Sequence, residues 1–321
     1  MDAQSQLRSE IMLVVSYTII LFFSLFIPAF FPFAIILLPI PIIVYATNSK
    51  ADRLYMIIGI LAVFTFVLTV ILQILWFIPL FVTSVISGLA IGLAIQKEKS
   101  PYETWIQGTI GFVISLLFIF VFTQYVLEIN WVEEIRIASD QSITNIMNML
   151  KEIDPSIESQ IEGQMEILRE QLFYMPNLIP AVIAILSIVF AFIAQWISYK
   201  VLNRRKEHTY RFPAVRRLSF PMAIFWLYIG ASLLMLFETN PTSGLFIVLQ
   251  NINSLMSFLL IIQGFTFVFF FAHHKKQSNA LPFIVLTLSL IITPLVYIIR
   301  LVGLIDMALS LRKRLRGSQT G

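Results

Sequence analysis

Residues 54–95 read LYMIIGILAVFTFVLTVILQILWFIPLFVTSVISGLAIGLAI, and none of these 42 residues is charged. A membrane-spanning helix needs about 20 predominantly apolar residues. The stretch is therefore long enough for two spans, which we place at Leu54–Gln73 and Ile74–Ile95. Gln73 and Trp76 interrupt the apolar run near its middle. They predict a tight turn between two helices at one face of a membrane.

The composition of the whole chain supports a membrane protein. Of its 321 residues, 58% are apolar and 12% are charged, and the mean hydropathy is +0.87. An ordinary soluble domain carries about 25% charged residues, so this chain cannot cover a soluble surface with polar groups. Because the chain contains no Cys, disulfides and thiol-based sites are excluded. We predict an all-α polytopic transmembrane helical bundle with about eight or nine spans.

Nine apolar segments can be distinguished. They are Ile11–Ile27, Phe33–Ala46, Leu54–Gln73, Ile74–Ile95, Trp105–Leu127, Asn177–Tyr199, Pro221–Phe237, Gly244–His273 and Leu281–Ile299. The second is short and carries Pro39 and Pro41, so we expect it to be kinked or only partly spanning. The chain thus divides into five membrane helices within residues 1–127, a polar hairpin at 128–175, and four more membrane helices within residues 176–321.

The basic residues predict the orientation of the chain. Cytoplasmic loops carry an excess of Lys and Arg, and the loop at 200–220 carries seven of them. With a cytoplasmic N-terminus, this loop and three other basic loops share the cytoplasmic side. We therefore expect a multi-pass protein of the bacterial cytoplasmic membrane. Nine crossings would place the basic C-terminal tail outside, so residues 281–311, broken at Pro294, either return as a re-entrant hairpin or cross differently.

Residues 128–175 form a long polar excursion. They include ten acidic and three basic residues, a net charge of −7. Their apolar residues recur every three or four positions, which indicates two amphipathic helices. Asp154 and Pro155 suit the N-cap and the first position of the second helix. We expect an acidic extracytoplasmic hairpin whose helices either pack together or lie on the membrane surface.

The sequence carries no motif that predicts catalysis. Acidic residues are nearly absent from the apolar segments, and no phosphate-binding loop, HExxH or GxSxG pattern occurs. The three His residues include the adjacent pair His273 and His274, next to Lys275 and Lys276, which would repel a cation. We therefore expect no enzyme activity, no cofactor and no metal site.

A first candidate site for a small molecule lies at one mouth of the predicted bundle. Gln73, Trp76 and Gln124 fall together at the extracytoplasmic ends of three segments. Aromatic residues at a membrane interface also form ordinary belts. This cluster therefore indicates either a ligand vestibule or an interfacial belt.

A second candidate site lies inside the eighth segment. Gln250, Asn253 and Ser257 share one helical face, which either lines a cavity for a polar ligand or forms interhelical hydrogen bonds. Arg300 and Asp306 in the last segment are six residues apart. At that spacing they do not pair with each other on a helix. Each therefore needs another partner or a place at the membrane interface.

Two ladders of small residues predict close helix packing inside the protein. The first is in the fourth segment and the second in the fifth: Ser84, Gly88 and Gly92, then Gly108, Gly111 and Ser115.

Five arginines of the basic loop are candidate contacts for anionic lipid headgroups or for a membrane protein partner. They are Arg204, Arg205, Arg211, Arg216 and Arg217. Near a membrane surface each Lys or Arg contributes about 1 kcal/mol of attraction to anionic lipid. Because the loop adjoins apolar segments, these charges favour lipid, and we expect no nucleic-acid partner.

Short motifs connect the chain to a known family. In the basic loop they are Asn203-Arg204-Arg205, Tyr210-Arg211-Phe212-Pro213, and Arg216-Arg217-Leu218 leading into Pro221. Further along they are Gln263-Gly264 and the run 300–306, RLVGLID, before a basic end. With these motifs the chain resembles the YybS-like family of bacterial polytopic membrane proteins. That family is similar, in its first six helices, to the substrate-binding S components of energy-coupling-factor transporters.

The resemblance implies an S-component-like core up to about Tyr199, with a ligand site near the extracytoplasmic ends of its helices. It implicates residues 28–32, residues 73–79 and the acidic hairpin, which would act as a lid. This chain adds about three helices to that core. We therefore expect a transport-related, S-component-like protein that binds a small solute. The alternative is a non-transporting membrane scaffold or regulator that docks a partner through residues 203–220.

Overall fold

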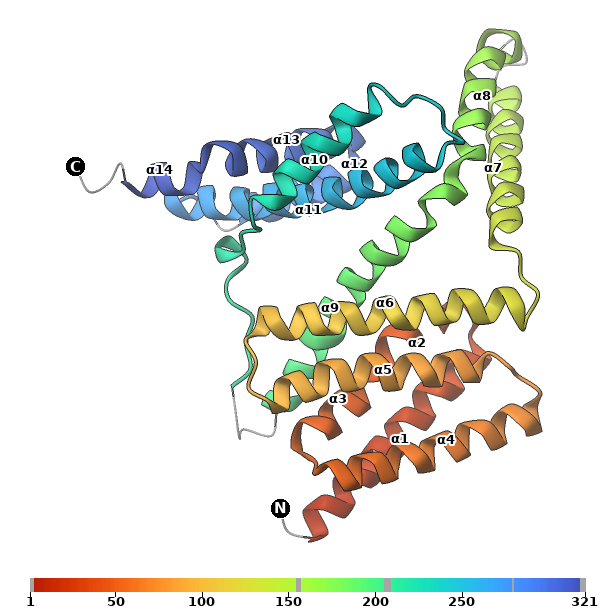
Figure 1. The fold of residues 1–321 in the computed structure, drawn as a ribbon, viewed down its shortest axis with the longest axis vertical. Helices are drawn as coiled ribbons and strands as arrows, with labels where there is room; N and C mark the ends of the chain where they lie inside the picture. The colour runs from red at the N-terminus through yellow and green to blue at the C-terminus, as the bar shows by residue number, and fades with distance from the viewer. Residues whose placement is uncertain (1–2, 154–156, 205–208, 279, 318–321) are drawn as a thin grey trace. The chain divides into compact units, whose positions relative to one another are not determined.

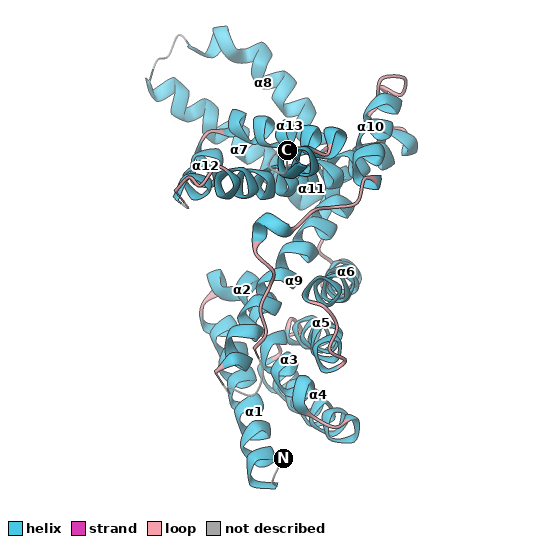
Figure 2. Ribbon diagram, turned by 90° about the vertical axis from the view of Figure 1, so that its left-hand side faces the viewer, coloured by secondary structure: helices cyan, strands magenta, loops and turns pink. Residues whose placement is uncertain are grey.

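The computed structural model describes residues 3–153, 157–204, 209–278 and 280–317. Helices make up most of these residues, and no strand occurs among them (Figure 2). Within this described part, seven helices are long and apolar enough to cross a membrane. Two shorter apolar helices are Ala223–Met235 and Ala280–Ser289. The prediction of an all-α polytopic membrane bundle is thereby confirmed.

The chain divides into two compact units. The first combines Met1–Asn130 with Ile183–Phe212, and the second combines Trp131–Val182 with Pro213–Gly321. The helices of the first unit are α1 (Ala3–Phe26), a 3-10 turn (Pro28–Phe30), α2 (Phe31–Leu37), α3 (Pro39–Asn48), α4 (Ala51–Leu72), α5 (Phe77–Gln96), α6 (Pro101–Tyr125) and most of α9 (Ile179–Asn203).

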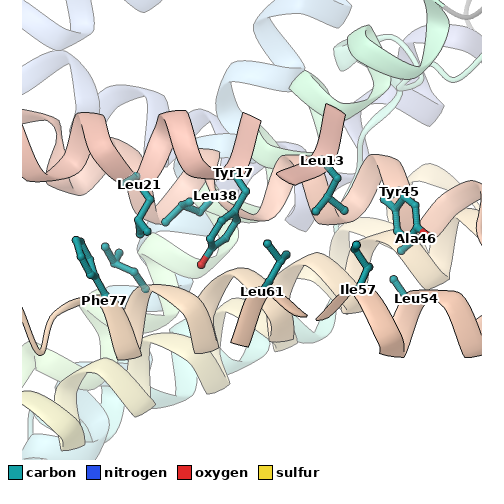
Figure 3. Packing of buried hydrophobic residues seen from close by; sticks show 12 residues of the cluster. Leu13, Tyr17, Leu21, Leu38, Tyr45, Ala46, Leu54, Ile57, Leu61 and Phe77 are labelled. Carbon is teal, nitrogen blue, oxygen red and sulfur yellow. The ribbon is translucent and has the colours of Figure 1, made fainter. Parts of the chain in front are cut away.

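An apolar core in the first unit joins α1 and α4 (Figure 3). Tyr17 and Leu21 on α1, and Leu61 on α4, are completely buried. Tyr17 and Leu21 are four residues apart, which places them on one face of α1. The Tyr17 hydroxyl lies 3.4 Å from Thr65 Oγ1 on α4, so the polar end of this buried ring has a hydrogen-bond partner.

The second apolar segment forms two short helices, α2 and α3, instead of one. The Leu38 N–H donates to the Ala34 carbonyl at 2.9 Å, so the chain stays helical where the two helices meet. Pro39 occupies the first position of α3, where a missing N–H is tolerated. Together the helices form the candidate span Phe31–Asn48.

Small residues line both helix contacts of α5, with α3 on one side and α6 on the other. A Cβ added to Gly92 would lie 2.7 Å from the Ala46 Cβ on α3. A Cβ added to Gly111 on α6 would lie 2.8 Å from the Ala90 Cβ on α5. Larger side chains would push these backbones apart. The two predicted ladders thus pack inside the first unit.

The second unit contains the hairpin and the C-terminal helices. Its elements are α7 (Trp131–Ile153), α8 (Ile157–Phe173), a 3-10 turn η2 (Met175–Leu178), the start of α9, a 3-10 turn η3 (Val215–Arg217), α10 (Ala223–Met235), α11 (Gly244–His274), α12 (Ala280–Ile291), α13 (Thr293–Leu309) and α14 (Leu311–Gly317).

The acidic excursion forms two helices that pack side by side, α7 and α8 (Figure 1). The Arg136 guanidinium lies 4.1 Å from the centre of the Phe173 ring, and the Arg169 Nε lies 3.6 Å from Asp140 Oδ1. Residues from the start of α7 thus meet residues from the end of α8, as an antiparallel hairpin requires. The cap expected at Asp154–Pro155 lies outside the described residues.

Asn251 on α11 holds the entry into α9. Its Nδ2 donates to the Asn177 carbonyl at 2.7 Å, and its Oδ1 accepts from the Ala181 N–H at 2.8 Å. These bonds satisfy a backbone carbonyl of η2 and a backbone N–H in the first turn of α9, which intrahelical bonds leave open. Since α9 continues beyond Val182, this one helix contributes residues to both units.

α11 and α13 run in the same direction (Figure 1). Three pairs of hydrogen-bonded residues show this, because the residue numbers increase together along the two segments. Ser257 pairs with Arg300 and Gln263 pairs with Asp306. Just beyond α13, Arg312 reaches Thr266. A parallel pair of successive long helices requires a return path between them.

α12 provides that return path. It has 12 residues, about 18 Å of helix, which is shorter than the roughly 30 Å hydrocarbon core. The chain then turns at Ile292, and Pro294 lies in the first turn of α13. α12 and α13 therefore favour the re-entrant alternative for residues 281–311. This arrangement brings the basic C-terminal segment back toward the end of α11 from which α12 departs.

Candidate functional site

The polar face of α11 meets α10 and α13. Asn253 Nδ2 donates to Ser232 Oγ on α10 at 2.6 Å, and Ser257 Oγ accepts from Arg300 Nη1 on α13 at 3.4 Å. Gln250 Oε1 is buried without a hydrogen-bond partner among the described residues. The interhelical alternative therefore accounts for Asn253 and Ser257, and it leaves the acceptor of Gln250 open.

Arg300 is the charged centre of this region, and we define the Arg300 cluster as Arg300, Ser257, Tyr228 and Tyr297. The guanidinium carbon lies 5.8 Å from the centre of the Tyr228 ring and 5.2 Å from that of Tyr297. No carboxylate of the described residues lies within 4.0 Å of this guanidinium. The cation is thus held by aromatic rings and one hydroxyl.

The Arg300 cluster lies near the middle of the helices, where Arg300 is half-buried and Tyr297 is 57% exposed. Ser257 follows the first residue of the 31-residue α11 by 13 positions, about 20 Å along the helix. The apolar length of α11 extends well beyond it in both directions. Arg300 itself is near the middle of the 17-residue α13. The cluster is therefore remote from either end of both helices, in the region that lipid or protein must cover.

Asp306 has a different environment, because Arg312 closes on it. The Arg312 Nε lies 2.9 Å from Asp306 Oδ2, and the side chains are 12% and 2% exposed, respectively. Gln263 Nε2 donates to the same carboxylate oxygen at 2.6 Å. The other Arg312 nitrogens donate to Thr266 Oγ1 at 2.7 Å and to the Leu218 carbonyl at 2.7 Å. We call this group, with Gln263, the Asp306 network.

Two glycines allow α11 and α13 to come this close. A Cβ on Gly264 would collide with the Ile299 carbonyl oxygen, and a Cβ on Gly303 would collide with the Leu260 carbonyl oxygen. The backbones of α11 and α13 are therefore in direct contact, which is the packing that small residues make possible in membranes. The Gln263-Gly264 motif thus combines a buried polar side chain with the contact point of the helices.

In the first candidate site two residues are exposed and the third packs against an aromatic ring. Gln73 ends α4 in the left-handed conformation with φ 56° and is exposed. Trp76 packs edge-on against Phe31, with ring centres 5.0 Å apart. Gln124 is exposed near the end of α6. A ligand role for these three residues stays a prediction.

Hydrogen bonds join the last residue of α9 to a described residue of the basic loop. Asn203 donates through Nδ2 to the Tyr210 carbonyl and accepts at Oδ1 from the Tyr210 N–H, both at 2.8 Å. Phe212 packs on Tyr199 and Phe192, with ring centres 5.4 and 5.0 Å apart. A residue seven positions along the chain is thus tied back to the last turn of α9.

The five loop arginines have different surroundings. Arg204, Arg211 and Arg217 are exposed, whereas Arg216 is half-buried and its carbonyl accepts from Arg312 Nη1 at 3.3 Å. Arg205 lies outside the described residues. Contacts of these arginines with lipid or with a partner stay predictions.

Sequence reasoning missed three participants. Tyr228 and Tyr297 looked like ordinary aromatic residues of apolar segments, and nothing in their spacing connects them to Arg300. Arg312 was interpreted only as part of a basic tail. The spacing of six residues between Arg312 and Asp306 does not predict their contact, because the left-handed Ser310, with φ 49°, turns the chain between them.

A family model described as a predicted membrane protein, DUF2232, matches residues 15–307. The chain belongs to this family. The DUF2232 match includes Arg300 and Asp306, and it ends before Arg312. The chain is also 27% identical over 233 residues to the "Uncharacterized protein YybS" of Bacillus subtilis (strain 168). That alignment covers 73% of this chain and 74% of the relative.

These matches confirm the resemblance to YybS-like membrane proteins, and a DUF2232 protein with several apolar helices is a multi-pass membrane protein. No solved structure matches the chain. The similarity of its first six helices to S components therefore stays a prediction.

Proposed function

We propose that this DUF2232 chain is a transport-related membrane protein that binds a small organic anion at the Arg300 cluster. The observation that carries the proposal is the guanidinium of Arg300, which lies midway along apolar helices without a carboxylate partner among the described residues.

The position of Arg300 is energetically unfavourable without a counter-charge. An Arg at the centre of a membrane helix costs about 2.5–3.5 kcal/mol on insertion scales. Cation–π contacts stabilise a cation by about 0.5–2 kcal/mol, and Tyr228 and Tyr297 make contacts of this kind with Arg300. A bound anion would stabilise the guanidinium further. This balance supports an anionic ligand over a purely structural role.

The chain itself does not place an acid at this depth. In the described membrane helices the acids are Glu10, Asp52, Glu103 and Asp306, and each lies within four residues of an end of its span or helix. Asp306 is already bound by Arg312 and Gln263. The counter-charge for Arg300 is therefore expected from outside the chain.

The surroundings of Arg300 suit an organic anion with an apolar body. Its planar guanidinium matches a carboxylate or phosphate in geometry. The rings of Tyr228 and Tyr297 offer apolar surface, and the open acceptor on Gln250 could accept a hydrogen bond from a donor group of the ligand along the same face of α11. Asn253 remains engaged with Ser232 and would serve as support.

Thermal unfolding of the full-length protein in nanodiscs tests the proposal. We expect one or more compounds of a panel of organic carboxylates to raise the unfolding temperature, and their neutral analogues to have no effect. A ligand at 100 times its Kd adds about 2.7 kcal/mol. Arg300→Gln should abolish the shift and Arg300→Lys should retain part of it. Arg217→Gln, which changes an exposed arginine of the same unit, is the matched control.

Two results would contradict the proposal. One is a folded protein that responds to no anion in the panel, and the other is a shift that survives in Arg300→Gln. For a compound that binds, uptake into proteoliposomes then tests transport, because a binding protein without transport activity would show the shift and no accumulation.

The alternative function, a scaffold or regulator that docks a partner through residues 203–220, is favoured by the hydrogen bonds that hold described residues near both ends of this loop. The Asn203–Tyr210 bonds hold the start of the loop and the Arg312–Leu218 bond holds its end. Crosslinking pull-downs with Arg204, Arg205, Arg216 and Arg217 changed to Gln should then lose a partner. The Arg312 contact with Arg216 uses the main chain, so these changes leave it in place. An unchanged set of partners would remove this alternative.

A further inference from the structure

The first unit contains a polar cavity that the proposed function does not use. It has a volume of about 400 Å³ and lies where α3 and α5 end, α6 begins and α9 ends. The residues that matter for its chemistry are Asn48, Gln96, Glu98, Lys99, Tyr199 and Arg211. Its volume falls within the usual range of small-molecule sites, about 300–1,000 Å³.

Fixed backbone surrounds this cavity. The turn between α5 and α6 passes through Glu98 in the left-handed conformation, with φ 53°. Gln96 Nε2 ties that turn to the Ser49 carbonyl at 2.7 Å. On the other side, Tyr210 stacks on Tyr199 with ring centres 5.5 Å apart. The lining residues therefore come from segments that hydrogen bonds and ring contacts position.

Two buried polar side chains of α9 have groups without partners in the described part of the chain, and one of them, Gln195, contacts the lining directly. Gln195 is fully buried, and its Nε2 donates to the Pro101 carbonyl at 2.9 Å and to the Tyr199 hydroxyl at 2.8 Å. Pro101 and Tyr199 both line the cavity. Gln195 Oε1 and the hydroxyl of the fully buried Ser198 have no hydrogen-bond partner among the described residues. Buried polar atoms are normally satisfied by protein, water or ligand.

The charged side chains of the lining indicate the chemical class of ligand that the cavity would bind. Lys99 and Arg211 are cationic, and Glu98 is the acid of the lining. Lys and Arg together favour a phosphate, which accepts several charge-assisted hydrogen bonds at once. Glu98, Asn48 and Gln96 favour hydroxyl or amino groups on the rest of the molecule.

We propose that this cavity is a binding site for a small, soluble phosphorylated metabolite, held by Lys99 and Arg211 at its phosphate and by the polar residues at its other groups. The site lies entirely in the first unit and does not rest on the function proposed for Arg300. A phospholipid headgroup carries the same phosphate chemistry, so the test must separate the two sources.

The test is phosphate binding by the full-length protein in nanodiscs of phosphatidylcholine, with glycerol 3-phosphate and inorganic phosphate as probes. We expect both probes to raise the unfolding temperature. Lys99→Gln combined with Arg211→Gln should weaken the apparent Kd at least tenfold. Lys97→Gln changes a lysine two positions away that does not line the cavity, and it should bind like the parent. Because Arg300 is intact in the double variant, a loss of binding there separates this site from the Arg300 cluster.

Repeating the titration in phosphatidylglycerol nanodiscs distinguishes the sources. An unchanged response assigns the site to a soluble phosphate compound. A response that anionic lipid suppresses in the parent overturns that choice and assigns the cavity to a lipid headgroup. The absence of a response in phosphatidylcholine nanodiscs, or an equal response in the double variant, would overturn the site altogether.

Discussion

The side-chain amide of Gln263 donates a 2.6 Å hydrogen bond to Asp306, whose carboxylate also accepts from Arg312. The three residues come from α11, α13 and α14, so one buried carboxylate joins three helices. Breaking a buried ion pair by removing one partner typically costs about 3–5 kcal/mol, because the other charge is left uncompensated. The Asp306 network is thus a sensitive point of the second unit.

We predict that Asp306→Ala lowers the free energy of unfolding by about 3 kcal/mol, since Arg312 loses its counter-charge. Unfolding of the purified protein by denaturant measures the change. Replacing both partners by apolar residues, Asp306→Leu with Arg312→Met, should recover much of the loss. Lys313→Gln alters an exposed charge next to Arg312 and should stay within about 0.5 kcal/mol of the parent. If Asp306→Ala is as stable as Lys313→Gln, the Asp306 network does not contribute to the free energy of unfolding.

We predict that Gly264→Ala destabilises the protein by about 1–3 kcal/mol, because the new methyl group meets the Ile299 backbone. Gly230→Ala provides the control, since a Cβ there meets nothing within 4 Å. A helical Gly→Ala change without a clash is neutral or stabilises by about 0.5–1 kcal/mol. Opposite signs for the two variants are expected in the same unfolding assay, and equal signs would contradict the packing of α11 on α13.

We predict that the C-terminal segment and the basic loop are accessible from the same side of the membrane. The chain has no Cys, so single variants can be labelled without background. Lys313→Cys and Arg217→Cys should react with a membrane-impermeant maleimide from one side, because α12 and α13 return the chain. Glu152→Cys on α7 should react from the other side. Labelling of positions 313 and 217 from opposite sides would exclude the re-entrant hairpin.

We predict that Asn203→Ala exposes the basic loop to protease. The change removes two 2.8 Å hydrogen bonds to Tyr210, and a local loss of about 1.4 kcal/mol corresponds to a tenfold rise in the open population. Trypsin cleavage after Arg211 should accelerate by roughly that factor. Asn145→Ala on the exposed face of α7 should leave the rate unchanged. An unaltered rate in Asn203→Ala would show that the ring contacts of Tyr210 and Phe212 suffice to hold the loop.

Much of the fold follows from local features of the sequence. Uncharged stretches such as residues 54–95 predict helices long enough to span, and the ladders around Gly92 and Gly111 predict close contacts inside the bundle. The two amphipathic helices of the hairpin follow from the three- and four-residue spacing of their apolar residues, whereas their packing against each other does not. These features depend on neighbours in the chain or on a single helix face, which a sequence displays directly.

The arrangement of α11 and α13 could not be predicted in the same way. Whether two helices run parallel depends on the path between them, and the break near Pro294 was compatible with both topologies. The partner of Asp306 depends on the left-handed conformation of Ser310. The presence of a serine in the sequence does not predict that conformation. Gln250, Asn253 and Ser257 were recognised as one face, but the neighbours of that face are set by tertiary packing.

Because α9 contributes residues to both units, the six-helix portion cannot be separated from the rest by a single cut. A chain that stops at Tyr199 would lose Tyr210 and Phe212, whose rings cover that tyrosine. It would also lose Asn251, which fastens the beginning of α9. A shortened chain that keeps both ends of α9 in place would therefore have to retain residues that follow Tyr199.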